Sequence, residues 1–151
     1  MKGSGIKKNL RDEGETLALG AFLAPRLDRG DIVKITGELG AGKTTLVRGI
    51  VTALGGDPSQ VHSPTFSLVH HYQTASIEII HCDFYRLPEG SGLDEFGGLE
   101  FFESDSIFLI EWPERVKLFD STIPNRLLCV DLRVDSSSRE AHITGPWKIV
   151  D

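Results

Sequence analysis

The chain has 151 residues and a mass of 16.6 kDa, a size that suits a single domain over residues 1–151. Its composition, 40% hydrophobic and 25% charged, is ordinary for a soluble globular protein, and no apolar run reaches the ~18 residues needed to span a membrane. A net charge of −6 argues against broad electrostatic binding to nucleic acid, although a local basic patch is not excluded. Because two cysteines are too few for a disulfide framework and the N-terminus lacks the apolar centre of a secretory signal, we expect a cytoplasmic protein.

The first predicted elements are a helix, a strand and a second helix. Residues 16–27 carry apolar residues at helical spacing, and Pro25 is placed to end or bend that helix. Residues 31–37 predict a buried strand that leads directly into a glycine-rich loop. A helix is expected over residues 43–54, and the turn residues at 55–58 end it.

Strands dominate the second half of the chain. Residues 66–72 and 77–83 both look extended, and the short connection between them suggests a hairpin. The remaining predictions are a loop over 88–94, a short helix over 98–102, a buried strand over 106–111, and strands over 127–134 and 141–144 around a serine-rich turn. Because strands mix with few helices, we expect a three-layer α/β fold with a mixed, mainly parallel central sheet and additional antiparallel strands.

The loop between the first predicted strand and the second helix matches a phosphate-binding motif. Gly37, Gly42, Lys43 and Thr44 satisfy the pattern G-x-x-x-x-G-K-[ST]. Glycines let the backbone approach phosphate closely, and consecutive N–H groups form a nest for an anion at the positive end of the following helix. In such loops the lysine reaches the β- and γ-phosphates, and the hydroxyl ligates Mg²⁺. The predicted nucleotide-binding residues are Glu38, Leu39, Gly40, Ala41, Gly42, Lys43, Thr44 and Thr45.

Two acidic residues are candidates for handling the metal ion and water. A P-loop enzyme needs an acid at a strand end to hold Mg²⁺ or to orient water. Asp83 ends one extended segment and Glu111 ends another; Glu111 follows the stronger apolar run, whereas Asp83 has the more usual side chain. Because both follow buried strands that should lie beside the P-loop in a parallel core, we expect both near the metal. The alternative is that one of them is a strand-end acid facing solvent.

Several other residues are weaker candidates. Thr65, which follows a proline in the Ser-Pro-Thr-Phe segment, is a candidate switch residue that senses γ-phosphate or its Mg²⁺, and a plain turn explains it equally well. Trp112 is either a core residue or a stacking platform near a nucleotide or a partner. Arg86 and Arg115 are candidates for contacts to phosphate or RNA, and Arg86 also for the edge of a nucleotide or partner site, although solvated surface arginines are more common. Zinc ligation is disfavoured because adjacent residues on a strand point to opposite faces, and the candidates come in adjacent pairs, His70 with His71 and His81 with Cys82.

Five segments occur together in an order that resembles a known family. They are GELGAGKTT (37–45), SPTF (63–66), HCDFYRL (81–87), GLEFF (98–102) and IEWPER (110–115). Over nearly its whole length the chain resembles the TsaE (YjeE) family of bacterial ATPases of tRNA threonylcarbamoyladenosine biosynthesis. Many families share the P-loop, but its combination with H-x-D-x-Y-R and E-W-P-E is far more specific. His62 departs from the pattern, where a small polar residue is expected, and this blurs the chemistry of the switch-like loop.

The resemblance implies a P-loop NTPase fold, binding of ATP and Mg²⁺, slow intrinsic hydrolysis, and work with a complex of the TsaB and TsaD proteins. That complex transfers a threonylcarbamoyl group to adenosine 37 of tRNA, so contact with tRNA is expected through the complex. The family itself does not make the transferred group and is thought to use ATP to support repeated rounds of transfer. The roles implied are phosphate binding for Lys43, Mg²⁺ ligation for Thr44, a switch-like loop for Thr65, metal and attacking water for Asp83 and Glu111, and the active-site edge for Trp112.

Three other functions would use the same motif. A small-molecule kinase would use the P-loop and Asp83 equally well, with Arg86 and Arg115 clamping an acceptor, but a kinase needs a lid that excludes water, and no long arginine-rich lid segment is visible. A GTP-dependent switch is disfavoured because the sequence contains no Asn-Lys-x-Asp to bind guanine. A binding module without turnover is disfavoured because two acids and a threonine are available for chemistry.

Overall fold

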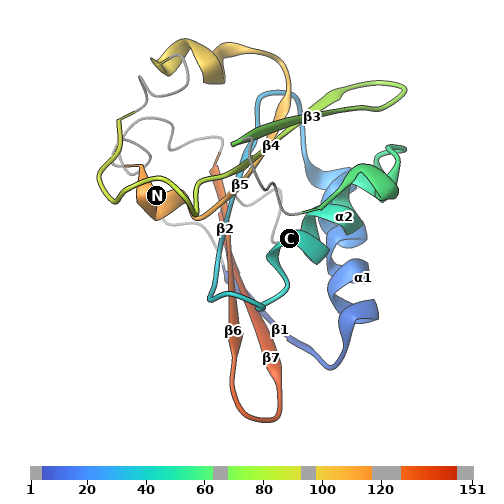
Figure 1. Ribbon diagram of the computed structural model, residues 1–151. Coiled ribbons are helices and arrows are strands. Elements are labelled where there is room, and N and C mark those ends of the chain that lie inside the picture. Colours follow the sequence, from blue (N-terminus) through green and yellow to red (C-terminus); the bar gives the residue numbers. More distant parts are fainter. Residues whose placement is uncertain (1–4, 63–67, 93–97, 117–126, 146–151) are drawn as a thin grey trace.

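A computed structural model describes residues 5–62, 68–92, 98–116 and 127–145. Within these ranges, seven strands form one sheet in the order β1-β7-β6-β2-β5-β4-β3 (Figure 1). The four central strands run parallel to one another: β6 (Leu127–Val134), β2 (Ile32–Thr36), β5 (Ile107–Glu111) and β4 (Glu78–Asp83). Antiparallel pairs complete both sides through β3 (Val69–Gln73), β7 (Arg139–Thr144) and β1 (Gly5–Leu10). The predicted mixed sheet with a parallel centre is confirmed.

Two helices lie side by side against one face of this sheet (Figure 1). Helix α1 (Glu13–Leu23) begins where the Asp12 carboxylate accepts a hydrogen bond from the Glu15 amide at 2.9 Å. The chain then tightens into a 3₁₀ turn, η1 (Ala24–Arg26), as the proline at position 25 predicted. Helix α2 (Lys43–Ala53) follows the glycine-rich loop. Within the described ranges no helix has both the length and the apolarity needed to cross a membrane.

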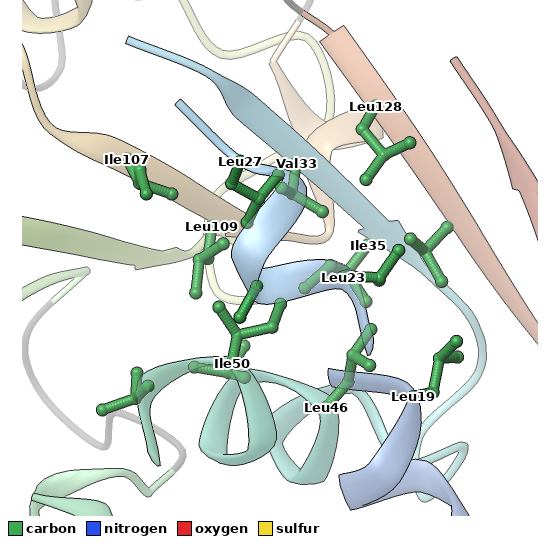
Figure 2. Packing of buried hydrophobic residues seen from close by; sticks show 14 of the residues in the cluster. Leu19, Leu23, Leu27, Val33, Ile35, Leu46, Ile50, Ile107, Leu109 and Leu128 are labelled. Atoms are coloured by element: carbon green, nitrogen blue, oxygen red, sulfur yellow. The ribbon is translucent and has the colours of Figure 1, made fainter. Parts of the chain in front are cut away.

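The core between helices and sheet fixes the segments on both sides of the glycine-rich loop. Leu46 and Ile50 of α2 are fully buried against Val33 and Ile35 of β2, the strand that precedes the loop (Figure 2). Leu23 of α1 joins the same cluster. Full burial of a side chain of this size contributes about 1.5–3 kcal/mol. The loop is therefore held at its two ends by the most deeply buried part of the protein.

Among the described residues, short 3₁₀ turns and loops, and no long helices, cover the opposite face of the sheet. The predicted helix over residues 98–102 is a 3₁₀ helix, η4 (Gly98–Glu103), and η5 (Pro113–Arg115) follows β5. The rings of Phe101 and Phe102 pack on Phe108 of β5, with ring centroids 5.6 and 5.1 Å apart. This second apolar cluster buries the face that the helices leave open.

Strand β1 was not predicted, and its sequence explains why. In GIKKNL only Leu10 is buried, and two lysines stand among the six residues. Edge strands often carry charged residues, so they lack the strong apolar alternation by which inner strands are found. The hairpin between β3 and β4 is confirmed by their antiparallel pairing, whereas residues 66 and 67 of the predicted strand lie outside the described residues.

Two glycines let α1 approach α2 closely. A Cβ atom on Gly20 would lie 2.8 Å from the Ile50 amide nitrogen and 2.8 Å from the Leu46 carbonyl oxygen. A Cβ atom on Gly49 would lie 2.5 Å from the Leu17 carbonyl oxygen. These neighbours are backbone atoms, which cannot rotate away. The absence of side chains at these two positions sets the distance between the helices.

We expect Gly20→Ala to lower the free energy of unfolding by about 1–3 kcal/mol, the usual cost of overpacking a core. Gly14→Ala in the same helix is the control, because Gly14 is exposed and its nearest neighbour, the capping Asp12 Oδ1 at 3.3 Å, is a side-chain atom that has to shift by only a few tenths of an ångström; the higher helix propensity of alanine should make this variant close to neutral. Urea denaturation of the three proteins measures the difference. Equal stability of Gly20→Ala and the unaltered chain would contradict the close helix contact.

Candidate functional site

The glycine-rich loop connects the end of β2 to the start of α2. Gly37, Gly40 and Gly42 have φ angles of 149°, 81° and 104°, a region that side chains other than glycine rarely adopt. A Cβ atom on Gly37 would also lie 2.7 Å from the Leu132 carbonyl oxygen of the neighbouring strand β6. The glycine spacing is therefore a requirement of the loop's path, and it sets the first turn of α2 at the mouth of a cavity.

The cavity has a volume of about 450 Å³ and gathers most of the predicted site residues. Of the predicted residues, its lining includes Leu39, Gly40, Gly42, Lys43, Thr44, Thr45, Asp83, Arg86, Glu111 and Trp112. Glu38 and Ala41 of the loop do not line the cavity, and Ala41 is buried. Thr65 lies outside the described residues. The structure thus brings the loop and both acids to one place, while the roles of the individual residues stay predictions.

Strand register explains why the two acids meet. Asp83 of β4 and Glu111 of β5 are paired across neighbouring parallel strands, and Glu111 is paired with Ile35 of β2 on its other side. Carboxyl ends of parallel strands meet at one edge of a sheet, which is also the edge from which the loop leaves β2. Glu111 is 2% exposed, whereas Asp83 is half-buried.

Lys43 is folded back onto its own loop. Its Nζ donates hydrogen bonds to the carbonyl oxygens of Gly37 at 2.6 Å and Glu38 at 2.7 Å. The same ammonium lies 4.4 Å from the ring centroid of Trp112, a distance at which a cation attracts an aromatic face. Burial lowers the pKa of Lys43, and the carboxylate of Glu111 works against that shift. The lysine is thus a sheltered cation at the floor of the cavity.

Trp112 owes its place to an unusual backbone conformation. With φ at 56° it is the one non-glycine residue with a positive φ in the described part of the chain. This left-handed residue turns the chain out of β5 into η5 and lays the indole ring over Lys43, with the Tyr85 ring 4.9 Å away. Strained residues of this kind cluster at binding and active sites.

Glu111 is the centre of a buried hydrogen-bond chain. The Thr44 hydroxyl donates to its Oε2 at 3.0 Å and its Oε1 at 3.2 Å, and His81 Nε2 lies 2.7 Å from Oε2. His81 Nδ1 lies 2.8 Å from the Tyr72 hydroxyl. Both His81 and Tyr72 are buried, at 0% and 2% exposure. Sequence reasoning gave neither residue a role in the site, because it considered His81 as a zinc ligand beside Cys82 and otherwise only as part of the H-x-D-x-Y-R motif.

The two neighbours His81 and Cys82 do point to opposite faces of β4, as the strand geometry predicted. Cys82 belongs to the second apolar cluster, where burial raises the pKa of its thiol. His71, the neighbour of Tyr72, faces outward and lies 3.2 Å from the half-buried carboxylate of Glu78. Side chains alternate between the two faces along β3 and β4, so knowledge of the strand register would have been enough to pick out Tyr72 and His81 as the residues that face the site.

The surroundings of the second acid, Asp83, disfavour its charged form. Burial and the nearby Glu111 carboxylate raise the pKa of Asp83, while the Tyr85 amide donates a hydrogen bond to its Oδ1 at 3.0 Å and works in the other direction. A divalent cation would relieve the repulsion that helps to raise the pKa of Asp83. Asp83, Glu111 and Thr44 are the residues that would hold such an ion.

Glu13 of α1 and Arg139 of β7 also line the cavity. The Arg139 Nε is the one buried side-chain nitrogen or oxygen atom that lacks a hydrogen-bond partner in the described part of the chain. Its guanidinium lies beside Gly42, where a Cβ atom would be 3.4 Å from Nη1. Sequence reasoning did not single out Arg139. By contrast Arg115, a candidate clamp, donates to the carbonyl oxygens of Tyr85 and Leu87 and so holds the loop after β4.

A glycine-rich turn followed by lysine and threonine at the start of a helix, set beside two strand-end carboxylates of a parallel sheet, is the arrangement of a P-loop protein. The crystal structure of Bacillus subtilis YdiB has the same fold, with a TM-score of 0.71 and 26% identity over 96% of this chain and 87% of that one. The family model described as threonylcarbamoyl adenosine biosynthesis protein TsaE matches residues 10–142. The chain belongs to the TsaE family.

Proteins named tRNA threonylcarbamoyladenosine biosynthesis protein TsaE resemble the chain over most of its length. The one from Rickettsia bellii is 36% identical over 91% of this chain and 94% of its own length. The one from Nostoc is 38% identical over 89% of this chain and 83% of its own. The one from Bacillus subtilis is 33% identical, over 87% and 80% respectively. The family resemblance predicted from the five sequence segments is confirmed.

The raised pKa of Asp83 predicts that Asp83→Asn will stabilise the ligand-free protein at neutral pH. A carboxyl whose pKa is higher in the folded than in the unfolded chain costs stability above its folded pKa, and that cost vanishes below the unfolded value of about 3.9. Asparagine keeps the oxygen that accepts from Tyr85. The melting temperature of the variant should therefore exceed that of the unaltered chain at pH 7, and the two should converge in acid.

Asp135→Asn provides a control of opposite sign. The amides of Ser137 and Ser138 donate to the Asp135 carboxylate and lower its pKa, so its charge stabilises the fold above the unfolded pKa and is lost as the pH falls through the folded pKa. This variant should be less stable than the unaltered chain at pH 7. A melting temperature for Asp83→Asn below that of the unaltered chain at pH 7 would contradict the conclusion that the charged form of Asp83 destabilises the fold.

Proposed function

We propose that the protein is a Mg²⁺-dependent ATPase of the cytoplasm that supports formation of N6-threonylcarbamoyladenosine at position 37 of tRNA, together with a complex of TsaB and TsaD. The observation that carries this proposal is the gathering of Lys43, Thr44, Asp83 and Glu111 around one cavity at the mouth of the loop. Membership of the TsaE family supports the role in this tRNA modification. Contact with tRNA occurs through the partner complex.

The described residues fit a nucleotide in three respects. The loop's glycines take the conformations that let backbone N–H groups face an anion at the start of α2. The Lys43 ammonium is buried beside them. The Arg139 Nε is buried without a hydrogen-bond partner in the lining of the same cavity, and its guanidinium lies beside Gly42 of the loop. A buried donor of this kind costs free energy until an acceptor reaches it.

Each residue has a distinct part in hydrolysis. Lys43 would exchange its hydrogen bonds to the Gly37 and Glu38 carbonyl oxygens for bonds to phosphate oxygens, and the Thr44 hydroxyl would turn from Glu111 to the metal ion. A Mg²⁺ ion held there would supply charge stabilisation during hydrolysis. Asp83 and Glu111 share the tasks of ligating the ion and of accepting a hydrogen bond from the attacking water. Trp112 covers Lys43 and limits the access of bulk water to it.

The small cavity agrees with an ATPase that acts within an assembly. The chain supplies a phosphate site and two acids, and the acceptor of the threonylcarbamoyl group is bound by the partner. P-loop proteins often hydrolyse slowly until a partner completes the site, which can raise the rate by about 10³–10⁵-fold. ATP turnover then serves to time the partner's cycle.

The first functional prediction concerns hydrolysis. The protein alone should release phosphate from ATP slowly, and addition of TsaB and TsaD should accelerate that release. Glu111→Gln should lower kcat by about 10²–10⁴-fold, the range for loss of a group that handles a proton, while ATP binding measured by calorimetry is retained. Asp131→Asn is the matched control. The Asp131 carboxylate accepts a hydrogen bond from the Thr36 hydroxyl, it belongs to β6, which flanks β2 on the side away from β5, and it lies outside the cavity.

Two outcomes of that assay would count against an ATPase. Transfer of phosphate to a small acceptor in place of release to water would indicate a kinase. Equal phosphate release by Glu111→Gln and the unaltered chain would show that the measured turnover does not occur at this site.

The second functional prediction concerns Arg139. Arg139→Met should weaken binding of ATP and ADP by about ten- to hundredfold, the effect of losing a hydrogen bond to a charged group. Binding of inorganic tripolyphosphate shows which part of the nucleotide Arg139 contacts: an unchanged tripolyphosphate affinity would place Arg139 on the nucleoside. Arg133→Met is the matched control, since this arginine is exposed and pairs with Asp131, which lies two residues earlier on the same strand β6. Equal loss of tripolyphosphate affinity would place Arg139 on the phosphates instead.

A further inference from the structure

The chain of side chains that ends at Glu111 crosses three neighbouring strands. Tyr72 stands opposite Ile79 on β4, two residues before His81, and His81 stands opposite Leu109 on β5, two residues before Glu111. Each step is therefore a diagonal between adjacent strands on one face of the sheet, which long side chains can span. The line runs from the edge strand toward the loop and ends at the Thr44 hydroxyl.

The bonding partners define which nitrogen of His81 carries hydrogen. An ionised Glu111 only accepts hydrogen bonds, so the His81 Nε2 that lies 2.7 Å from it must donate. A neutral imidazole then accepts at Nδ1 from the Tyr72 hydroxyl at 2.8 Å. Burial raises the pKa of Tyr72 to about 12, so this hydroxyl keeps its proton and can donate it to a hydrogen bond. Every polar atom in the chain then has a partner.

The two carboxylate oxygens of Glu111 accept different numbers of hydrogen bonds. Oε2 is contacted by both His81 and Thr44, whereas Oε1 has the 3.2 Å contact to Thr44. In the proposed function Thr44 turns to the metal ion, and His81 becomes the group that holds Glu111 in place. A carboxylate anchored through one oxygen presents the other in a fixed direction.

We propose that Tyr72 and His81 are positioning residues for Glu111: Tyr72 orients the imidazole, and the imidazole fixes the Glu111 carboxylate so that its free oxygen faces the reacting end of the cavity. This inference rests on the proposed ATPase function and assigns to it two residues that touch neither nucleotide nor metal. Burying a tyrosine hydroxyl and an imidazole in an apolar face costs free energy unless each is bonded, and here both bonds lead to the acid.

The test compares kcat with nucleotide affinity in four variants. Tyr72→Phe removes one hydroxyl, and His81→Leu removes the donor to Glu111; each should lower kcat by about 10- to 100-fold, the usual effect of losing a group that orients a ligand or acid. His81→Gln places an amide N–H where Nε2 lies and should restore most of the rate lost in His81→Leu. The Kd for a non-hydrolysable ATP analogue with Mg²⁺ should stay within about threefold in all of them.

His71→Gln is the matched control, because it removes an exposed imidazole from the residue next to Tyr72 and from a similar contact with a glutamate. Its kcat should equal that of the unaltered chain. Melting temperatures identify any variant that fails to fold at the assay temperature. If folded Tyr72→Phe and His81→Leu hydrolyse ATP as fast as His71→Gln, the two residues only support the fold and the proposal is wrong.

A second readout needs no nucleotide and so stands apart from the proposed function. In ¹⁵N NMR spectra of the ligand-free protein, His81 should show hydrogen on Nε2 and an unprotonated, hydrogen-bonded Nδ1, with the signals assigned by their absence in His81→Gln. Tyr72→Phe should shift the Nδ1 signal and leave His71 unchanged. Hydrogen on Nδ1 alone would overturn the positioning chain even in an active enzyme, whereas absence of ATPase activity with the expected spectrum would refute only the proposed function.

Discussion

One buried charge, the carboxylate of Glu111, connects the parts of this protein that must act together. A carboxylate at 2% exposure is tolerated only when hydrogen bonds replace the water it has lost. Thr44 supplies one from the first turn of α2, and His81 supplies another from β4. Satisfying this single group therefore fixes the loop's helix and two strands relative to one another. The geometry of the cavity follows from that requirement.

Two of the side chains proposed to bind phosphate and metal, Lys43 and Thr44, already have hydrogen-bond partners within the protein. Lys43 donates to the carbonyl oxygens of Gly37 and Glu38, and Thr44 donates to Glu111. A phosphate ligand and its metal ion must therefore replace existing hydrogen bonds, so each new contact contributes only the difference between two bonds of similar kind. These hydrogen bonds fix the shape of the site before a ligand binds, which limits the ordering cost of binding.

Features set by local spacing could be predicted from the sequence, whereas features set by strand register could not. The glycine spacing from Gly37 onward defined the loop, and apolar runs that stop at Asp83 and Glu111 placed both acids at one edge of the sheet. The positions of Tyr72 and Arg139 depend on which strands lie side by side and on how far each is shifted. Tyr72 reaches the site by diagonals across β4, and the hairpin of β6 and β7 lines Arg139 up with the loop.

The two edge strands of the sheet influence whether molecules of this protein aggregate. A free strand edge exposes unpaired N–H and C=O groups, onto which another molecule can add a strand and begin to aggregate. Along β1 the side chain of Lys7 is 65% exposed and pairs with Glu140, and Lys8 lies over the ring of Phe22. Along β3, His71 and Gln73 project outward and both contact Glu78. Any incoming strand would have to strip water from these charged and polar groups, so both borders of the sheet discourage growth by strand addition.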